Sequence, residues 1–306
     1  MQRTLARKAR LSGIGVHSGM PATATILPAP CDTGVRFVRL DVGKGDNLID
    51  ARFDGVTDTA LCTCIGNDNG VKVSTIEHLM AALAGCGIDN ALVEVDGPEV
   101  PIMDGSSKPF LAALLSAGTV EQDEPLRAIR ILKPVRVTRG DKTAELLPAD
   151  HFEIEYDIDF EDSAIGKQHR VERFTGDAFI RDYADSRTFC TLGDVEALRK
   201  IGFARGGTLQ NAIVVDNGRV LNREGLRHRD EFVRHKMLDA VGDLALAGVP
   251  IIGRYRGVRA GHDMTNRLLR ALFADPTAWR YEEVSDRGLV ALDYRTTDTT
   301  RELACA

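Results

Sequence analysis

The chain contains an internal repeat, and this feature constrains its fold more than any other. The strand-like runs "TATILPAP" (23–30) and "TAELLPAD" (143–150) are both closed by Pro-Ala. Two later stretches, "EHLMAALAGCGIDNALVEVDG" (77–97) and "RHKMLDAVGDLALAGVPIIGRYRG" (234–257), both run from a histidine through an apolar helix and a glycine-containing turn into a strand. This self-similarity indicates two copies of one α/β unit.

Two copies of one unit predict two domains. A chain of 306 residues is also long for a single compact core. The polar segment 116–128, which contains Pro125, separates the copies. We therefore expect an N-terminal domain over 1–122 and a C-terminal domain over 127–306. In each half the alternating strand patterns precede the long helices, an order that favours an α+β fold over a doubly wound parallel sheet.

The composition is that of an ordinary globular protein, with 43% hydrophobic and 27% charged residues. The net charge of −6 gives no reason to expect a nucleic-acid partner, because phosphate binding needs clustered Lys and Arg. No apolar run approaches the roughly 20 residues that span a bilayer. Six scattered cysteines, two of them in "LCTCI" (61–65), predict neither a disulfide framework nor a metal knuckle. We expect a cytoplasmic protein without a transmembrane segment.

Polar side chains line one side of the predicted helix over 230–248. At ~100° per residue, His235, Asp239 and Asp243 fall within about a third of its circumference. Such a stripe is typical of the solvated side of an amphipathic helix. Phe232 lies in the same stripe, however, and an aromatic side chain there suits the wall of a cleft better than open water.

Residues four apart on a helix are neighbours, so His235 and Asp239 could both reach one metal ion. His78 opens the apolar helix of the first copy and occupies the place of His235 in the repeat. Two histidines and one carboxylate suit a hydrolytic zinc site that keeps a coordination position open. We therefore predict that His78, His235 and Asp239 are metal ligands.

Glu77 has two interpretations. The stretch "STIE" (74–77) fits a capping box, in which the glutamate binds back to the start of the helix. Alternatively, Glu77 is a general base that takes a proton from the attacking water, and the spacing favours neither reading. His262 lies where a strand gives way to a helix. It could protonate a leaving amine while Asp243 holds it charged, and surface exposure is its alternative.

Long stretches of the chain resemble one enzyme family. They are, in order, "STIEHLMAAL", "VDGPEVPIMDGSSKPF", "SRTF", "VLNREGLRHRDEFVRHKMLDAVGDLALAG" and "AGHDMTN". They resemble the zinc-dependent UDP-3-O-acyl-N-acetylglucosamine deacetylases of bacterial lipid A synthesis. The resemblance implies two similar domains that form a β-α-α-β sandwich, each a mixed sheet packed on helices, with the active site between them. It also implies hydrolysis of the 2-acetamido group of the UDP-sugar, which releases acetate.

The resemblance also implies roles for individual residues. These are ligation of one Zn²⁺ per chain by His78, His235 and Asp239, general base catalysis by Glu77, general acid catalysis by His262 with Asp243 as its charge partner, and oxyanion stabilisation by Thr188. Fe²⁺ could compete for the same ligands.

The substrate carries a diphosphate and a fatty acyl chain, and the resemblance implies residues for both. An insert over about 188–214 would form an apolar passage for the acyl chain. Without the resemblance, an amphipathic surface helix is the ordinary interpretation of that insert. The substrate-binding set is Lys142, Lys236 and Arg259 for the diphosphate, Phe160 near the uracil, Phe189, Val195, Leu198, Ile201, Phe203 and Ala204 along the passage, and Leu61 with Cys62.

The chain departs from the family pattern after "RTF". The family often has Gly and then an aromatic residue there, whereas this chain has Cys190 and Thr191. The departure changes the expected shape of the acyl passage and leaves the zinc ligands untouched.

Two other functions fit parts of the pattern. One is a zinc amidohydrolase that acts on another acylated amino sugar and needs no apolar passage, and the other is a non-catalytic nucleotide-sugar binding protein. We expect a monomer with a small-molecule substrate. The C-terminal "RELACA" (301–306) fits either a frayed end or a handle for a regulatory protease.

Overall fold

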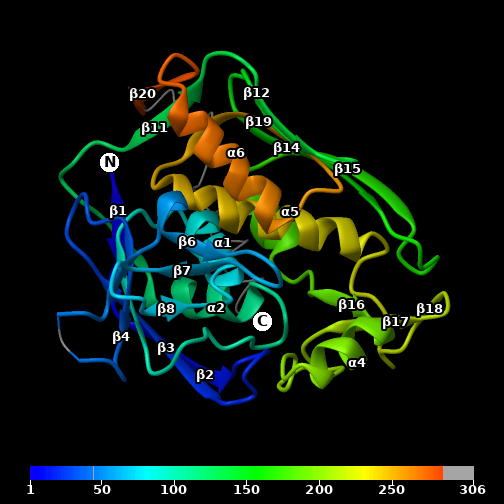
Figure 1. Cartoon of the computed structure of the whole chain (residues 1–306). Coiled ribbons are helices and arrows are strands. Elements are labelled where there is room, and N and C mark those ends of the chain that lie inside the picture. Colours follow the sequence, from blue (N-terminus) through cyan, green and yellow to red (C-terminus); the bar gives the residue numbers. More distant parts are fainter. Residues whose placement is uncertain (44, 285–306) are drawn as a thin grey trace.

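The computed structural model describes residues 1–43 and 45–284, so the C-terminal "RELACA" lies outside the described residues. The fold is α+β, as expected, with helices between two mixed sheets (Figure 1). None of the helices in this described part combines the length and the apolar character that a bilayer crossing requires.

The first sheet has the strand order β2-β3-β9-β4-β5. Its central strand β9 runs antiparallel to β3 and parallel to β4. Buried and more exposed residues alternate along β3, as expected for a strand with one face against helices. The elements are β2 (Ala9–Ile14), β3 (Pro21–Pro28), β4 (Val35–Arg39), β5 (Leu48–Asp50) and β9 (Ala91–Val95), with α1 (Glu77–Gly85) before β9 and α2 (Lys108–Ala117) after it.

The second sheet repeats this topology. Its central strand β19 again runs antiparallel to β13 and parallel to β14, and the outer pairs β12-β13 and β14-β15 are antiparallel. The elements are β12 (Val135–Arg139), β13 (Lys142–Leu147), β14 (Phe152–Asp159), β15 (Lys167–Arg173) and β19 (Ile251–Val258), with α5 (Glu231–Leu244) before β19 and α6 (His262–Ala274) after it. The two similar units predicted from the sequence are therefore confirmed.

Each copy carries an addition between its fourth strand and its first long helix. In the first copy it is a small sheet of β6 (Val56–Asp58), β7 (Cys64–Gly66) and β8 (Lys72–Val73). In the second it comprises α3 (Gly176–Ala178), the short π-helix η2 (Phe179–Tyr183), β16 (Phe189–Thr191), α4 (Leu192–Lys200), β17 (Ile213–Asp216) and β18 (Arg219–Val220). The predicted insert 188–214 falls within this second addition.

The remaining elements extend the sheets or join the copies. They are β1 (Arg3–Leu5), η1 (Phe53–Gly55), β10 (Thr119–Glu121), β11 (Arg127–Ile131), η3 (Ala245–Ala247) and β20 (Trp279–Glu283). The pairing of β1 with β10 places the start of the chain beside the end of the first copy. This pairing supports the domain limits 1–122 and 127–306, which remain a prediction.

The two copies meet through α1 and α5, which lie against each other between the sheets (Figure 1). Most residues of both helices are buried, including the polar stripe of α5. The interpretation of that stripe as a solvated helix face is therefore wrong.

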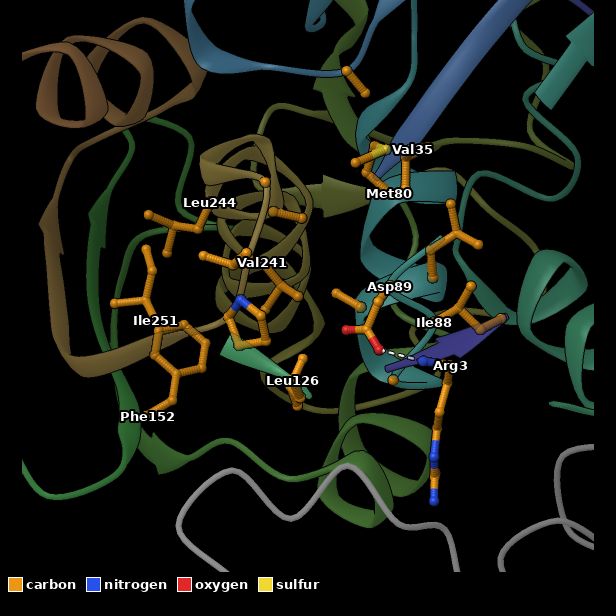
Figure 2. Close-up of a pocket in the computed structure, with 18 of the residues that line it drawn as sticks. Arg3, Val35, Met80, Ile88, Asp89, Leu126, Phe152, Val241, Leu244 and Ile251 are labelled. Atoms are coloured by element: carbon orange, nitrogen blue, oxygen red, sulfur yellow. Dashed lines mark hydrogen bonds between the residues drawn. The ribbon is translucent and has the colours of Figure 1, made fainter. Parts of the chain in front are cut away.

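A cavity of about 100 Å³ lies beside this helix contact (Figure 2). Met80 of α1, Val241 and Leu244 of α5, and Phe152 of β14 contribute to its mostly apolar wall. Among the described residues of this wall Asp89 is the one acidic side chain, and its carboxylate accepts a hydrogen bond of 2.7 Å from the backbone N–H of Arg3. An apolar surrounding of this kind disfavours the charged form of a carboxyl group.

Candidate active site

Helices α1 and α5 bring together the three residues predicted as metal ligands. His78 is the second residue of α1, and His235 and Asp239 lie one turn apart on α5. The Nε2 atoms of His78 and His235 lie 3.6 and 3.3 Å from Oδ1 of Asp239. All three residues are buried, and one ligand atom from each lies within 4.8 Å of the other two.

The chemistry of these three atoms fits a bound cation. Nδ1 of His235 donates a hydrogen bond of 3.0 Å to the carbonyl of Ser186, so its Nε2 carries the lone pair that faces Asp239. Burial lowers the pKa of His235 to about 3, which keeps the ring neutral. Oδ1 of Asp239 has no hydrogen-bond partner among the described residues. A lone pair facing a carboxylate is unfavourable unless a cation lies between them.

Lys236 completes the surroundings of Asp239. Its ammonium donates a hydrogen bond to Oδ2, the oxygen that points away from the two imidazoles. Burial would lower the pKa of Lys236, but the charge of Asp239 and the hydrogen bond raise it. Lys236 therefore fixes one carboxylate oxygen and leaves the other available to a metal.

Glu77 is not part of a capping box. Among the described residues no side chain caps the start of α1, and the hydroxyl of Ser74 bonds instead to the carbonyl of Pro98. The carboxylate of Glu77 is buried and accepts a hydrogen bond of 3.0 Å from the backbone N–H of Thr63. Burial raises the pKa of Glu77, although the neighbouring His262 opposes the shift. The capping interpretation is therefore wrong, and the carboxylate faces the site.

His262 is the first residue of α6, at the strand-to-helix junction predicted from the sequence. Its Nδ1 lies 2.8 Å from Oδ2 of Asp243, and its Nε2 lies 4.0 Å from Oε1 of Glu77. Only 12% of the His262 side chain is exposed, so surface exposure is the wrong alternative. Burial would lower its pKa, but the charge and hydrogen bond of Asp243 raise it to about 9.

The predicted diphosphate and uracil residues lie on the second sheet. Lys142 is exposed at the start of β13, and Arg259 follows β19, where it forms ion pairs with Asp141 and Asp159. Phe160 is 40% exposed just after β14.

A row of aromatic rings links this sheet to the ligand cluster. The ring of Phe160 lies 5.3 Å from that of Phe189, and Phe189 lies 6.1 Å from the ring of His235. A row of aromatic rings therefore runs from the exposed Phe160 to His235, one of the three predicted ligands.

The predicted acyl-passage residues lie in the addition of the second copy. Val195 and Leu198 of α4 are half-buried and Ala204 is buried, whereas Ile201 is 69% and Phe203 43% exposed. The loop after α4 is held against the first copy, since the backbone N–H of Gly206 bonds to the carbonyl of Val16. The segment thus spans the two copies.

Thr188, Leu61 and Cys62 lie on segments that border the site. The half-buried Thr188 follows Ser186 closely, and its N–H bonds to the carbonyl of Gly105. Leu61 is 40% exposed and Cys62 is buried, directly before Thr63. Within "LCTCI", only Cys64 and Ile65 belong to the strand β7.

Sequence reasoning missed three residues that support the site. Thr63 donates hydrogen bonds to both Glu77 and Asp243, and Arg187 forms a buried ion pair with Glu231 at the start of α5. Thr63 lies between Cys62, a predicted substrate-binding residue, and Cys64, and no motif in the sequence singles it out. Periodicity cannot identify such contacts, because the partners are far apart in the sequence.

Three buried metal-binding groups beside a carboxylate and a His–Asp pair are typical of metal-dependent hydrolases. Residues 2–274 match the family model described as "LpxC: UDP-3-O-acyl N-acetylglycosamine deacetylase". The chain belongs to this family.

Curated relatives agree over nearly the whole chain. The UDP-3-O-acyl-N-acetylglucosamine deacetylase of Phenylobacterium zucineum (strain HLK1) is 53% identical over 279 residues, covering 91% of this chain and 95% of that protein. The protein of the same name from Idiomarina loihiensis is 50% identical, and the match covers 92% of each chain. The one from Pasteurella multocida is 48% identical, and the match covers 96% of each chain.

Proposed function

We propose that the protein hydrolyses the 2-acetamido group of UDP-3-O-acyl-N-acetylglucosamine in lipid A biosynthesis, releasing acetate and a free amine. One observation carries the proposal: His78, His235 and Asp239 converge from two copies of the repeat beside Glu77 and His262. We further propose a monomer in the cytoplasm, with one zinc ion per chain held by these three side chains. Fe²⁺ is the alternative for the same donors.

When bound, zinc would supply Lewis acidity, which polarises the amide carbonyl and lowers the pKa of a water molecule to near neutral pH. Glu77 takes the proton of the attacking water at its carboxylate. Burial raises the pKa of Glu77, which makes the carboxylate a better proton acceptor. The backbone N–H of Thr63 holds one oxygen of Glu77, so the other is available to the reaction.

His262 delivers a proton to the leaving nitrogen, because an unprotonated amine anion is too poor a leaving group. Its raised pKa of about 9 keeps the imidazole charged at neutral pH. Asp243 maintains that charge from Nδ1, so Nε2 is the atom that donates. Thr188 helps to stabilise the oxyanion in this proposal, a role that depends on a donor fixed before charge develops.

The remaining residues bind the rest of the substrate. Arg259 and Lys142 attract the diphosphate at the edge of the second sheet, and Lys236 adds a cation beside the ligands. Phe160 offers an exposed ring for the uracil base. The acyl chain lies along the segment that contains Val195, Leu198 and Ala204, together with Phe189.

Metal analysis combined with acetate release tests the proposal. The wild-type protein should bind about one zinc per chain and release acetate from the acylated UDP-sugar. Glu77→Ala should keep the metal and lose turnover by roughly 10² to 10⁴ or more. In Asp239→Ala, by contrast, the primary effect should be a loss of metal affinity. Zinc loss in Glu77→Ala with retention in Asp239→Ala would overturn the assignment.

A substrate comparison separates the proposal from the alternatives. Acetylated glucosamine without the acyl chain should react far more slowly than the acylated UDP-sugar. Equal rates would favour an amidohydrolase for another acylated amino sugar. Binding without any acetate release would favour a non-catalytic nucleotide-sugar binding protein.

A further inference from the structure

Thr63 uses each of its polar groups around the active site. Its backbone N–H donates to Oε2 of Glu77 at 3.0 Å, and its hydroxyl donates to Oδ1 of Asp243 at 2.5 Å. Its carbonyl accepts the N–H of Ile76 at 3.4 Å. Thr63 is only 2% exposed, so water cannot readily replace these partners.

The hydroxyl contact crosses the boundary between the two copies. Thr63 lies just before β7 in the first copy, whereas Asp243 lies on α5 in the second. The other oxygen of Asp243 bonds to Nδ1 of His262, and Nε2 of that ring faces Glu77 at 4.0 Å. Thr63, Asp243, His262 and Glu77 therefore form a closed ring of contacts.

The Thr63 hydroxyl determines how Asp243 meets His262. A hydrogen bond to a carboxylate is stronger than one between neutral groups, and it restricts the rotation of the carboxylate. Without the hydroxyl, a buried oxygen of Asp243 would lose its donor, which carries a desolvation cost. With one donor fewer, Asp243 would be less constrained in rotation, and its negative charge would act more strongly on His262.

We propose that Thr63 is a positioning residue that aligns Asp243, and through it His262, with Glu77. The inference rests on the proposed roles of Glu77 and His262. Thr63 acts through its two carboxylate partners and has no role of its own in proton transfer.

The test compares Thr63→Val, which removes the hydroxyl and keeps the shape, with Thr63→Ser, which keeps the hydroxyl. Thr4→Val is the matched control, because Thr4 is also buried and its hydroxyl donates to the carbonyl of Asn90 in the first copy. The measurements on zinc-loaded protein are kcat and KM for acetate release, zinc content, Tm and the pH titration of His262 by NMR.

We expect Thr63→Val to lower kcat by roughly 10- to 100-fold, the effect of losing a contact that orients a catalytic group, with KM and zinc content unchanged. Thr63→Ser should restore kcat to within a few fold. Thr4→Val should lower Tm alone. The charged groups that face His262 are Asp243, Glu77 and Asp239. Because Asp243 would bear more charge toward the ring in Thr63→Val, the titration of His262 should move to higher pH.

Other results would overturn the inference. An unchanged kcat in Thr63→Val, or a loss of kcat that Thr63→Ser does not restore, would leave Thr63 without a positioning role. A fall in Tm equal to that of Thr4→Val, with an unmoved His262 titration, would reduce Thr63 to a structural contact. Failure of the wild-type protein to release acetate would instead count against the proposed function, and the NMR titration would still decide the role of Thr63.

Discussion

Gly242 of α5 faces the backbone carbonyl of Glu77 across the contact between the two copies. A Cβ atom at Gly242 would lie 2.1 Å from that oxygen and 3.1 Å from Cα of Glu77. The close approach of α5 to the first turn of α1 therefore requires a residue without a side chain. That approach is also what brings His78 and Glu77 to Asp239 and Asp243.

Gly242→Ala should destabilise the protein and reduce its activity. The added methyl group meets backbone atoms rather than a flexible side chain, so α1 and α5 must move apart. We expect a loss of about 1–3 kcal/mol in the free energy of unfolding, as for other overpacked sites. Denaturant unfolding measures it, with Gly193→Ala in the exposed helix α4 as control. A destabilisation of the two variants by equal amounts would contradict the prediction.

The rate of acetate release should fall as pH rises through about 9, where His262 loses its proton. The pKa of this histidine is raised above its ordinary value of 6.5, so its contribution to stability is full below about 6.5 and is lost as pH rises through about 9. Asp243→Asn removes the neighbouring charge and should move the alkaline limb of the kcat/KM profile to lower pH. An unmoved limb would exclude His262 as the group responsible.

Metal removal should lower the stability of the folded protein. A zinc ion bound by His78, His235 and Asp239 would join α1 of one copy to α5 of the other. Zn²⁺ at 100 times its Kd stabilises a folded state by about 2.7 kcal/mol, so adding it to metal-free protein should raise Tm. Glu77→Gln should show the same rise, and Asp239→Ala should show little. A full rise in Asp239→Ala would place the ion elsewhere.

The repeat could be predicted from the sequence because each copy carries its own periodic pattern of apolar residues. The sequence also placed His78 and His235 at equivalent positions, and from there their convergence followed from the packing of the two equivalent helices. It could not decide between the capping and catalytic interpretations of Glu77. That decision depended on Thr63 and His262, which contact Glu77 only in the folded chain.

The contacts that hold the site together were beyond sequence reasoning. The hydrogen bond from Thr63 to Asp243 joins residues 180 positions apart, and no periodic signal relates them. The need for glycine at position 242 follows from a distance between two helices, which their sequences do not encode locally. The resemblance to a family identified residues of the reaction and missed these supporting residues.

Asp89→Asn should stabilise the protein at alkaline pH. Burial beside the apolar cavity raises the pKa of Asp89 to about 7, although the N–H of Arg3 opposes the shift (Figure 2). The folded state therefore binds this proton more tightly than the unfolded chain, and stability is lost as pH rises from about 4 to about 7. Asparagine keeps an acceptor for Arg3 without the charge. Its stability relative to wild type should rise by on the order of 4 kcal/mol between pH 4 and pH 8. Parallel pH profiles would contradict this.

Glu231→Gln should be among the most destabilising single substitutions in the protein. Glu231 is fully buried, and its carboxylate accepts from the backbone N–H and from Nε of Arg187, at 3.0 and 2.9 Å. Arg187 is itself only 2% exposed, so neutralising Glu231 leaves this buried cation paired mainly with the exposed Glu224. Breaking such a pair costs about 3–5 kcal/mol.

The double variant Arg187→Met with Glu231→Leu should recover much of this loss, because it removes both charges. Asp54→Asn breaks the exposed pair with Arg52 and serves as the control, with an expected change below about 1 kcal/mol. Arg187 also adjoins Ser186, whose carbonyl orients His235, so Glu231→Gln should weaken zinc binding as well as stability. Chemical denaturation and zinc titration of the single and double variants measure the two effects. If Glu231→Gln is no more destabilising than Asp54→Asn, the buried pair does not hold the start of α5 in place.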